Sequence, residues 1–256
     1  MTLLDLMNKP NLFITSSQFD AALFDLDGVL TATAKIHAAC WKRLFDEFLQ
    51  QHAQKTGEPF KPFDLVDDYK LYVDGKMRYV GVQSFLASRG IQLPYGNPSD
   101  PPEYSTVCGL GNFKDIYFDE VLHSQSVEVY DGSIALVRHL HQQGFKMAVV
   151  SSSHHCEAVL KAAEIEDYFG AIVDGNLTDQ LHLAGKPAPD AFRLGAEQLG
   201  VEPKRAVIFE DAISGVQAGH VGKFGLVVGV DQTQNADALL QNGADIVVRD
   251  LSELLS

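Results

Sequence analysis

The 256-residue chain carries 34 acidic and 20 basic residues, and its formal net charge at neutral pH is −14. This balance excludes a nucleic-acid partner, because neutralising phosphates requires clustered Lys and Arg. The three cysteines are widely spaced and odd in number, which favours a reduced protein over a disulfide framework. Because the start of the sequence has no leader pattern and no apolar run reaches about 18 residues, we expect a cytoplasmic protein with no membrane partner.

The first predicted element lies in "AALFDLDGVL", residues 21–30. Ala21 to Phe24 are continuously apolar and Gly28 permits a sharp turn, which is typical of a parallel strand covered on both faces. Asp25 and Asp27 are two residues apart, so their side chains point to the same side of the extended chain. They are expected at the sheet edge where open α/β folds bind ligands.

Residues 34–128 show helical patterns without a strand-like run. Two apolar faces are predicted, and they consist of Trp41, Leu44, Phe45, Phe48 and Leu49, and of Phe113, Ile116, Tyr117 and Val121. The Pro- and Gly-rich stretch "LPYGNPSDPPEYS" between them is typical of a loop. We therefore predict a helical module inserted after the first strand, in a position to act as a lid.

Regular alternation begins after residue 130. The apolar runs "KMAVVSS", "AIVDG", "AVIFED", "FGLVVGV" and "ADIVVRD" alternate with helical segments, which indicates βαβ units and a parallel sheet. Ser133 is the expected N-cap of a helix over residues 134–143, and Pro189 and Asp190 are expected in the first turn of a helix that runs to Leu199.

A second acidic pair, Glu210 and Asp211, ends the run "AVIFED". If both strands are central and parallel, four carboxyl groups meet at one edge of the sheet, where their like charges oppose one another. A hard divalent cation resolves that conflict, and a set of oxygen ligands alone favours Mg²⁺. A single Asp at a strand end is more often an ordinary cap, but two such pairs together favour the metal.

Positive and hydrogen-bonding groups for a phosphate are expected next to this edge. Ser151, Ser152 and Ser153 follow the predicted strand "KMAVV", where hydroxyls and the N–H groups of the next helix can bind an anion. Lys186 in "GKPAPD" offers a point charge just ahead of a predicted helix. Taken alone, the serines are equally consistent with helix capping and the lysine with a surface position.

Four segments in fixed order, "DLDGVL", "VVSSS", "GKPAPD" and "FEDAISGVQAG", resemble the four motifs of the haloacid dehalogenase superfamily. Within it the chain is most similar to the β-phosphoglucomutase-like subfamily. The resemblance implies an α/β fold with a Rossmann-like three-layer core and parallel sheet, plus an inserted α-helical cap domain. The core would comprise residues 1–33 and 129–256, and the cap residues 34–128.

The resemblance also implies roles for individual residues. Asp25 would attack phosphorus to give an aspartyl phosphate, and Asp27 would be the general acid and base. Mg²⁺ would be held by the Asp25 carboxylate, the Asp27 main-chain carbonyl and Asp211, with Glu210 beside them. Ser151 and Lys186 would bind the transferring phosphoryl group, and the neighbouring serines would assist.

Residues of the predicted cap match further family positions. Thr33 and His37 in "TATAKIH" match the hinge residues that couple cap closure to the general acid. Arg78 in "DGKMR", with Gly75 and Lys76, matches the segment that grips the far phosphate of the substrate. A fork of donors from the cap suits a bisphosphate intermediate that turns over without leaving.

The chain also departs from the family pattern. Ala32 stands where the mutases carry Asp, and Asp74 stands near an expected basic residue. His154 and His155 replace Lys and Asn after the serines, and the cap is longer around residues 50–72 and 92–107. These changes affect the expected binding of the second phosphate and the choice of substrate.

The leading hypothesis from the sequence is a monomeric, Mg²⁺-dependent phosphotransferase acting on a small sugar phosphate. It would be a β-phosphoglucomutase that interconverts β-glucose 1-phosphate and glucose 6-phosphate. The alternative is a sugar-phosphate phosphatase that uses the same residues. A third hypothesis, a sensor that binds a sugar phosphate without catalysis, is disfavoured because every acid–base and metal position is filled.

Overall fold

The computed structural model describes residues 14–124, 126–232 and 234–255, and the side chain of residue 123 is not described. The start of the predicted core, residues 1–13, lies outside these ranges, and so does the opening stretch on which the expectation of no leader rests. Across the described residues, every helix is too short or too polar to cross a lipid bilayer.

A six-stranded parallel sheet forms the centre of the fold, in the order β3-β2-β1-β4-β5-β6. Its strands are β1 (Ala21–Phe24), β2 (Lys146–Val150), β3 (Ala171–Val173), β4 (Ala206–Glu210), β5 (Leu226–Val230) and β6 (Ile246–Val248). Strand β1 lies between β2 and β4, with Phe24 opposite Val149 on one side and Phe209 on the other. The predicted parallel sheet is confirmed.

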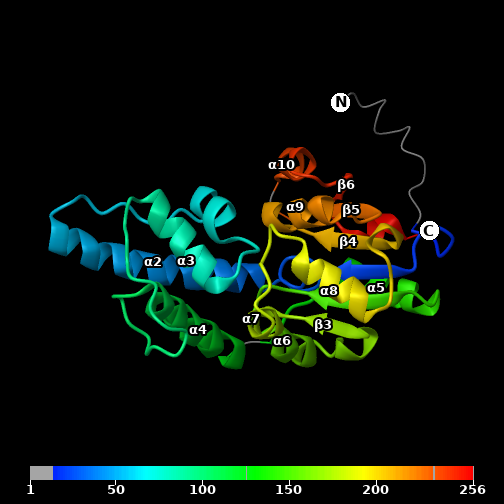
Figure 1. Ribbon diagram of the computed structural model, residues 1–256, viewed down its shortest axis with the longest axis horizontal. Coiled ribbons are helices and arrows are strands. Elements are labelled where there is room, and N and C mark those ends of the chain that lie inside the picture. Colours follow the sequence, from blue (N-terminus) through cyan, green and yellow to red (C-terminus); the bar gives the residue numbers. More distant parts are fainter. Residues whose placement is uncertain (1–13, 125, 233, 256) are drawn as a thin grey trace.

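Helices cover both faces of the sheet (Figure 1). They are α5 (Asp131–Gln142), α6 (Cys156–Ala162), α7 (Gly175–Gln180), α8 (Asp190–Gln198), α9 (Ile213–Gly222) and α10 (Ala236–Gln241), with short helical turns at Glu166–Tyr168, Pro203–Arg205 and Leu251–Leu254. Ala22 and Phe24 pack with α5 and α6, whereas Ala21 and Leu23 pack with α8 and α9. The alternating side chains of β1 thus join two apolar layers, and the predicted three-layer α/β class is confirmed.

The segment between β1 and α5 is helical in the described residues. It contains α2 (Ala34–Thr56), the π-helical turn η1 (Tyr69–Val73), α3 (Arg78–Ser88) and α4 (Val107–Ser124). In Figure 1 these helices lie together beyond the carboxyl ends of the strands, beside rather than over the sheet. We call this helical layer the cap. The exact domain limits at residues 33/34 and 128/129 stay a prediction.

The structure corrects two local predictions. Ser133 lies within α5 rather than capping it, because its hydroxyl donates to the Val29 carbonyl at 2.6 Å, in the turn after β1. The buried face of α4 also differs from the predicted one. Ile116 is 42% exposed, whereas Lys114 and Phe118 are buried, and this rotation of the helix turns a lysine toward the carboxyl ends of the strands.

Candidate active site

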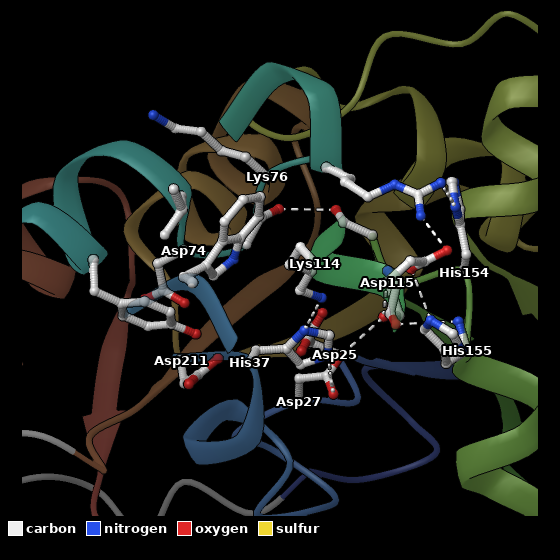
Figure 2. Close-up of a pocket in the computed structure, with 18 residues that line it drawn as sticks. Asp25, Asp27, His37, Asp74, Lys76, Lys114, Asp115, His154, His155 and Asp211 are labelled. Atoms are coloured by element: carbon white, nitrogen blue, oxygen red, sulfur yellow. Dashed lines mark hydrogen bonds and ion pairs between the residues drawn. The ribbon is translucent and has the colours of Figure 1, made fainter. Parts of the chain in front are cut away.

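One pocket lies between the cap and the carboxyl ends of β1, β2 and β4 (Figure 2). The core contributes Asp25, Asp27, Ser151, Ser152, Ser153, His154, His155 and Asp211, and the cap contributes His37, Trp41, Tyr69, Val73, Asp74, Gly75, Lys76, Arg78, Lys114 and Asp115. Nearly all the candidate site residues therefore meet at one place, although they come from segments far apart in the sequence. Thr33, Lys186 and Glu210 lie directly behind the lining residues.

Lys186 is buried between two carboxylates at the sheet edge. Its Nζ donates to Asp25 Oδ1 and to Glu210 Oε1, each at 2.5 Å, and to the Val150 carbonyl at 3.1 Å. Burial opposes the charge of Lys186, but the two carboxylates outweigh it and raise the pKa of the ammonium. Burial, with the nearby charges of Glu210 and Asp27, raises the pKa of Asp25 despite the lysine.

Asp25, Glu210 and Asp211 form a group with the composition of a hard-cation site. Each offers one carboxylate oxygen, and these atoms lie within 4.8 Å of one another. Gly28 makes room for Asp211: its φ is +96°, and a Cβ there would lie 1.9 Å from Asp211 Oδ2. Three oxygen ligands around one point fit Mg²⁺, which binds carboxylates and keeps several waters.

Asp27 faces away from this group, toward the cap. Thr33 donates to its Oδ1 at 2.5 Å, Ser151 donates to its Oδ2 at 3.2 Å, and His37 Nε2 lies 3.2 Å from Oδ1. Burial alone would raise the pKa of Asp27, but His37, Thr33 and the charge of Lys114 hold it below the ordinary range. The carboxylate is therefore held in its ionised form.

Lys114 completes this network and was not predicted from the sequence. It is buried on α4, and its Nζ lies 2.6 Å from His37 Nδ1. Burial lowers the pKa of Lys114 to about 8, and burial followed by the charge of Lys114 lowers the pKa of His37. Because the ammonium only donates, His37 accepts it at Nδ1 and carries its proton at Nε2, facing Asp27. The sequence feature that could have indicated this buried lysine is its position among the aromatic and apolar residues of "FKDIYF".

The three serines after β2 have different positions. Ser151 is buried, and its hydroxyl also accepts a hydrogen bond from the Ser153 N–H at 3.1 Å. Ser152 donates to the Gly75 carbonyl at 2.8 Å, so it joins the core to the cap. The Ser153 hydroxyl accepts the N–H of His155 at 3.2 Å. Ser151 thus faces the Asp27 carboxylate, while the other two order the loop around it.

Arg78 is held in a mixed network rather than left open. It forms an ion pair with Asp115 of α4, and its guanidinium nitrogen Nη2 lies 2.7 Å from His154 Nδ1. His155 Nε2 lies 2.8 Å from the other oxygen of Asp115, and His154 Nε2 lies 2.9 Å from Asp179. Burial would raise the pKa of Asp115, but His155 and Arg78 outweigh it and lower that pKa. The two histidines therefore contact the cap.

The other two residues expected to grip the far phosphate differ from each other. Gly75 lies against the core, where its φ is +66° and a Cβ would approach Ser214 Oγ to 2.4 Å. Lys76 is one of the residues that line the pocket. Its ammonium donates to the Leu71 carbonyl at 2.9 Å and to Ser84 Oγ at 3.1 Å, and Figure 2 shows it pointing away from the carboxylates.

Comparison with known proteins identifies the family. A sequence profile of haloacid dehalogenase-like hydrolases matches residues 19–222. The chain belongs to the haloacid dehalogenase superfamily. It is 48% identical to a β-phosphoglucomutase of Mycobacterium bovis over 92% of this chain and 91% of that protein. These matches confirm the β-phosphoglucomutase-like subfamily, and the chain is an enzyme of phosphoglucomutase type within this superfamily.

Two further matches extend the comparison. The chain is 37% identical, over 91% of its length, to a stretch covering 17% of an uncharacterised glycosyl hydrolase of Mycobacterium tuberculosis. Its fold resembles a crystal structure of β-phosphoglucomutase from Clostridium difficile, with a TM-score of 0.72, 24% identity and coverage of 92% of this chain and 93% of that one. The region that matches this chain thus makes up most of the Mycobacterium bovis protein and a small part of the Mycobacterium tuberculosis protein.

Proposed function

We propose that the protein is an Mg²⁺-dependent β-phosphoglucomutase, which converts β-glucose 1-phosphate to glucose 6-phosphate through a bisphosphate and an aspartyl phosphate. The observation that carries this proposal is the placement of two carboxylates with opposite surroundings. Asp25 lies against Lys186 and the acidic group of the core, and Asp27 lies against Thr33 and His37 at the cap.

Asp25 is the nucleophile in this proposal. Its carboxylate attacks phosphorus, the P–O bond to the sugar breaks, and an acyl phosphate remains on the enzyme, so one difficult displacement becomes two easier ones. Lys186, whose ammonium donates to Asp25 from behind the pocket, would bind a phosphoryl oxygen in this proposal, and Ser151 lines the pocket at the end of β2. A divalent cation, which the Asp25 carboxylate, the Asp27 main-chain carbonyl and Asp211 would hold with Glu210 beside them, would supply positive charge for the phosphoryl oxygens.

Asp27 is the general acid and base in this proposal. It protonates the sugar oxygen that leaves and later removes the proton of the hydroxyl that attacks the phosphoenzyme. His37, held by Lys114, and Thr33 fix its orientation. Since His37 and Lys114 belong to cap helices, the general base is complete only when the cap lies on the core.

Retention of an intermediate favours an isomerase over a hydrolase. The pocket encloses about 60 Å³, whereas sites for small organic ligands enclose about 300 Å³ or more. The sugar phosphate therefore enters only after the cap moves, and closure then shields the phosphoenzyme from water. The match to a Mycobacterium tuberculosis protein named as an uncharacterised glycosyl hydrolase also supports a carbohydrate substrate.

A phosphatase acting on a sugar phosphate is the second candidate. The observation in its favour is the ion pair between Arg78 and Asp115, because that arginine is the expected ligand of a second phosphate. If the pair persists during turnover, the bisphosphate loses a cap anchor and water can compete for the phosphoenzyme.

One product assay separates the two. The protein is incubated with β-glucose 1-phosphate, Mg²⁺ and a trace of the 1,6-bisphosphate, and glucose 6-phosphate and inorganic phosphate are followed together. Stoichiometric glucose 6-phosphate supports the mutase, and predominant inorganic phosphate supports the phosphatase. If a panel of sugar phosphates gives neither product, both catalytic proposals are wrong and a sensor remains.

A further inference from the structure

Asp74 brings a fourth carboxylate to the acidic group at the sheet edge, and it comes from the cap. Asp74 and Asp211 line the same pocket, and both also line a second cavity between the cap and the core. Figure 2 shows the two side chains on the same side of the site. Asp74 does not belong to the close trio of Asp25, Glu210 and Asp211, so it lies beside that trio rather than within it.

The backbone on either side of Asp74 is docked on the core. The Asp74 carbonyl accepts a hydrogen bond from Ser214 Oγ at 3.0 Å, in the first turn of α9 after Asp211. The Gly75 carbonyl accepts one from Ser152 at 2.8 Å, and Gly75 lies so close to Ser214 that it has no room for a Cβ. Opening the cap would therefore carry the Asp74 carboxylate away from Asp211.

The electrostatics agree with this closeness. Burial, and then the charge of Glu210, raise the pKa of Asp74 to about 7. Lys186 opposes both effects, but its hydrogen bonds go to Asp25 and Glu210. Docking the cap thus brings the Asp74 carboxyl beside the acidic trio of the core, and Lys70 and Lys76 are among the cap lysines that line the same cavities.

Given the proposed function, we propose that Asp74 is the contribution of the cap to the Mg²⁺ centre, acting through cation-bound water, so that cation binding and cap docking stabilise each other. Mg²⁺ retains several waters in protein sites, and carboxylates that hydrogen-bond to such waters tune affinity from outside the ligand shell. Tyr69 lines the same pocket as Asp74, and its interaction with that carboxyl lowers the pKa of Asp74. Asp74 is a positioning residue here and has no direct contact with phosphate.

Magnesium binding without substrate tests the proposal. Trp41 is the single tryptophan of the chain and lines the pocket, so its fluorescence can follow a Mg²⁺ titration beside isothermal titration calorimetry. We expect Asp74→Asn to weaken Mg²⁺ binding about tenfold or more and Asp74→Glu to recover part of the loss. Asp67→Asn removes an exposed carboxylate from the same part of the cap and is expected to leave binding unchanged.

Two stability readouts separate linkage from a merely structural role. In EDTA at pH 8, Asp74→Asn should unfold at the same temperature as the wild type or a higher one, because repulsion is relieved. Adding Mg²⁺ should raise its unfolding temperature less than that of the wild type, because the stabilisation by a ligand grows with the ratio of ligand concentration to Kd. Mg²⁺ should also slow amide hydrogen exchange around residues 73–76 in the wild type more than in the variant.

The outcomes distinguish this inference from the proposed function. If the wild type fails to bind Mg²⁺, the proposed function and the inference are both wrong. If the wild type binds Mg²⁺ and Asp74→Asn binds it with the same affinity, the inference alone is wrong. Equal destabilisation of the variant with and without Mg²⁺ also overturns it, because Asp74 would then be only a structural contact.

Discussion

The ammonium nitrogen of Lys114 lies 2.6 Å from Nδ1 of His37, and His37 Nε2 lies 3.2 Å from the Asp27 carboxylate. The ring of His37 also stacks on Phe118, with centroids 4.3 Å apart. A buried positive charge on α4 thus fixes the tautomer and orientation of a histidine on α2, which in turn holds the proposed general base. This relay accounts for a lysine buried in an otherwise apolar helix face.

Replacing Lys114 should change how the free energy of unfolding depends on pH. Burial lowers the pKa of Lys114 from 10.5 to about 8, so the folded state binds fewer protons than the unfolded state between these values. Stability should therefore rise with pH from about 8 to about 10.5, by at most ~3 kcal/mol. Urea unfolding should show this rise in the wild type and its loss in Lys114→Met.

The same variant should lose turnover. Without the ammonium, His37 has no fixed tautomer, and we expect kcat for the isomerisation to fall by about 10- to 100-fold, part of what general acid–base catalysis contributes. If Lys114→Met kept the wild-type kcat and the pH dependence of unfolding, the relay from Lys114 to Asp27 would have no role.

Gly28→Ala should damage the proposed metal site through Asp211. An added Cβ would overlap Asp211 Oδ2 at 1.9 Å, and the φ of +96° disfavours any side chain. We expect Mg²⁺ affinity to fall about tenfold or more. Gly57→Ala is the matched control, because its φ is also positive, at +76°, but nothing lies within 4 Å. It should cost about 1 kcal/mol of stability and no Mg²⁺ affinity, and equal Mg²⁺ losses in both variants would contradict the role of Gly28.

Arg78→Ala should impair isomerisation more than simple hydrolysis. The bisphosphate intermediate of the proposed mutase reaction carries a second phosphate that Arg78 is expected to bind, whereas a small phosphate ester such as p-nitrophenyl phosphate has none. We expect kcat/KM for isomerisation to fall about 100-fold or more, as for loss of a charge-assisted hydrogen bond. Arg89→Ala, which breaks an ion pair with Asp68 elsewhere in the cap, is the control. Equal losses in both assays would exclude this role of Arg78.

The sequence predicts the core of the site well because strand ends are local signals. Asp25, Asp27 and Asp211 each follow an apolar run, and parallel strands bring their carboxyl ends to one edge regardless of side-chain packing. The roles assigned to these residues stay predictions, but their meeting at one pocket follows from topology alone.

The cap could be predicted only in outline. Lys114 was missed because its burial depends on the rotation of α4, which is set by packing against α2 and α3 rather than by local pattern. The ammonium of Lys76 turns to a carbonyl and a hydroxyl within the cap, a choice among rotamers that spacing does not encode. The contacts of His154 and His155 with Arg78 and Asp115 likewise depend on how the cap meets the core.

The central claim is that Asp25 carries the phosphoryl group, and mapping that group tests it most directly. The protein is mixed with Mg²⁺ and substrate, quenched in acid within one turnover and reduced with borohydride, which converts an aspartyl phosphate to homoserine with release of phosphate. After digestion, the modified residue is located by mass spectrometry. The account predicts that the modification lies on Asp25 and is lost in Asp25→Asn together with both catalytic activities. Modification at another residue, or turnover that persists in Asp25→Asn, would contradict it.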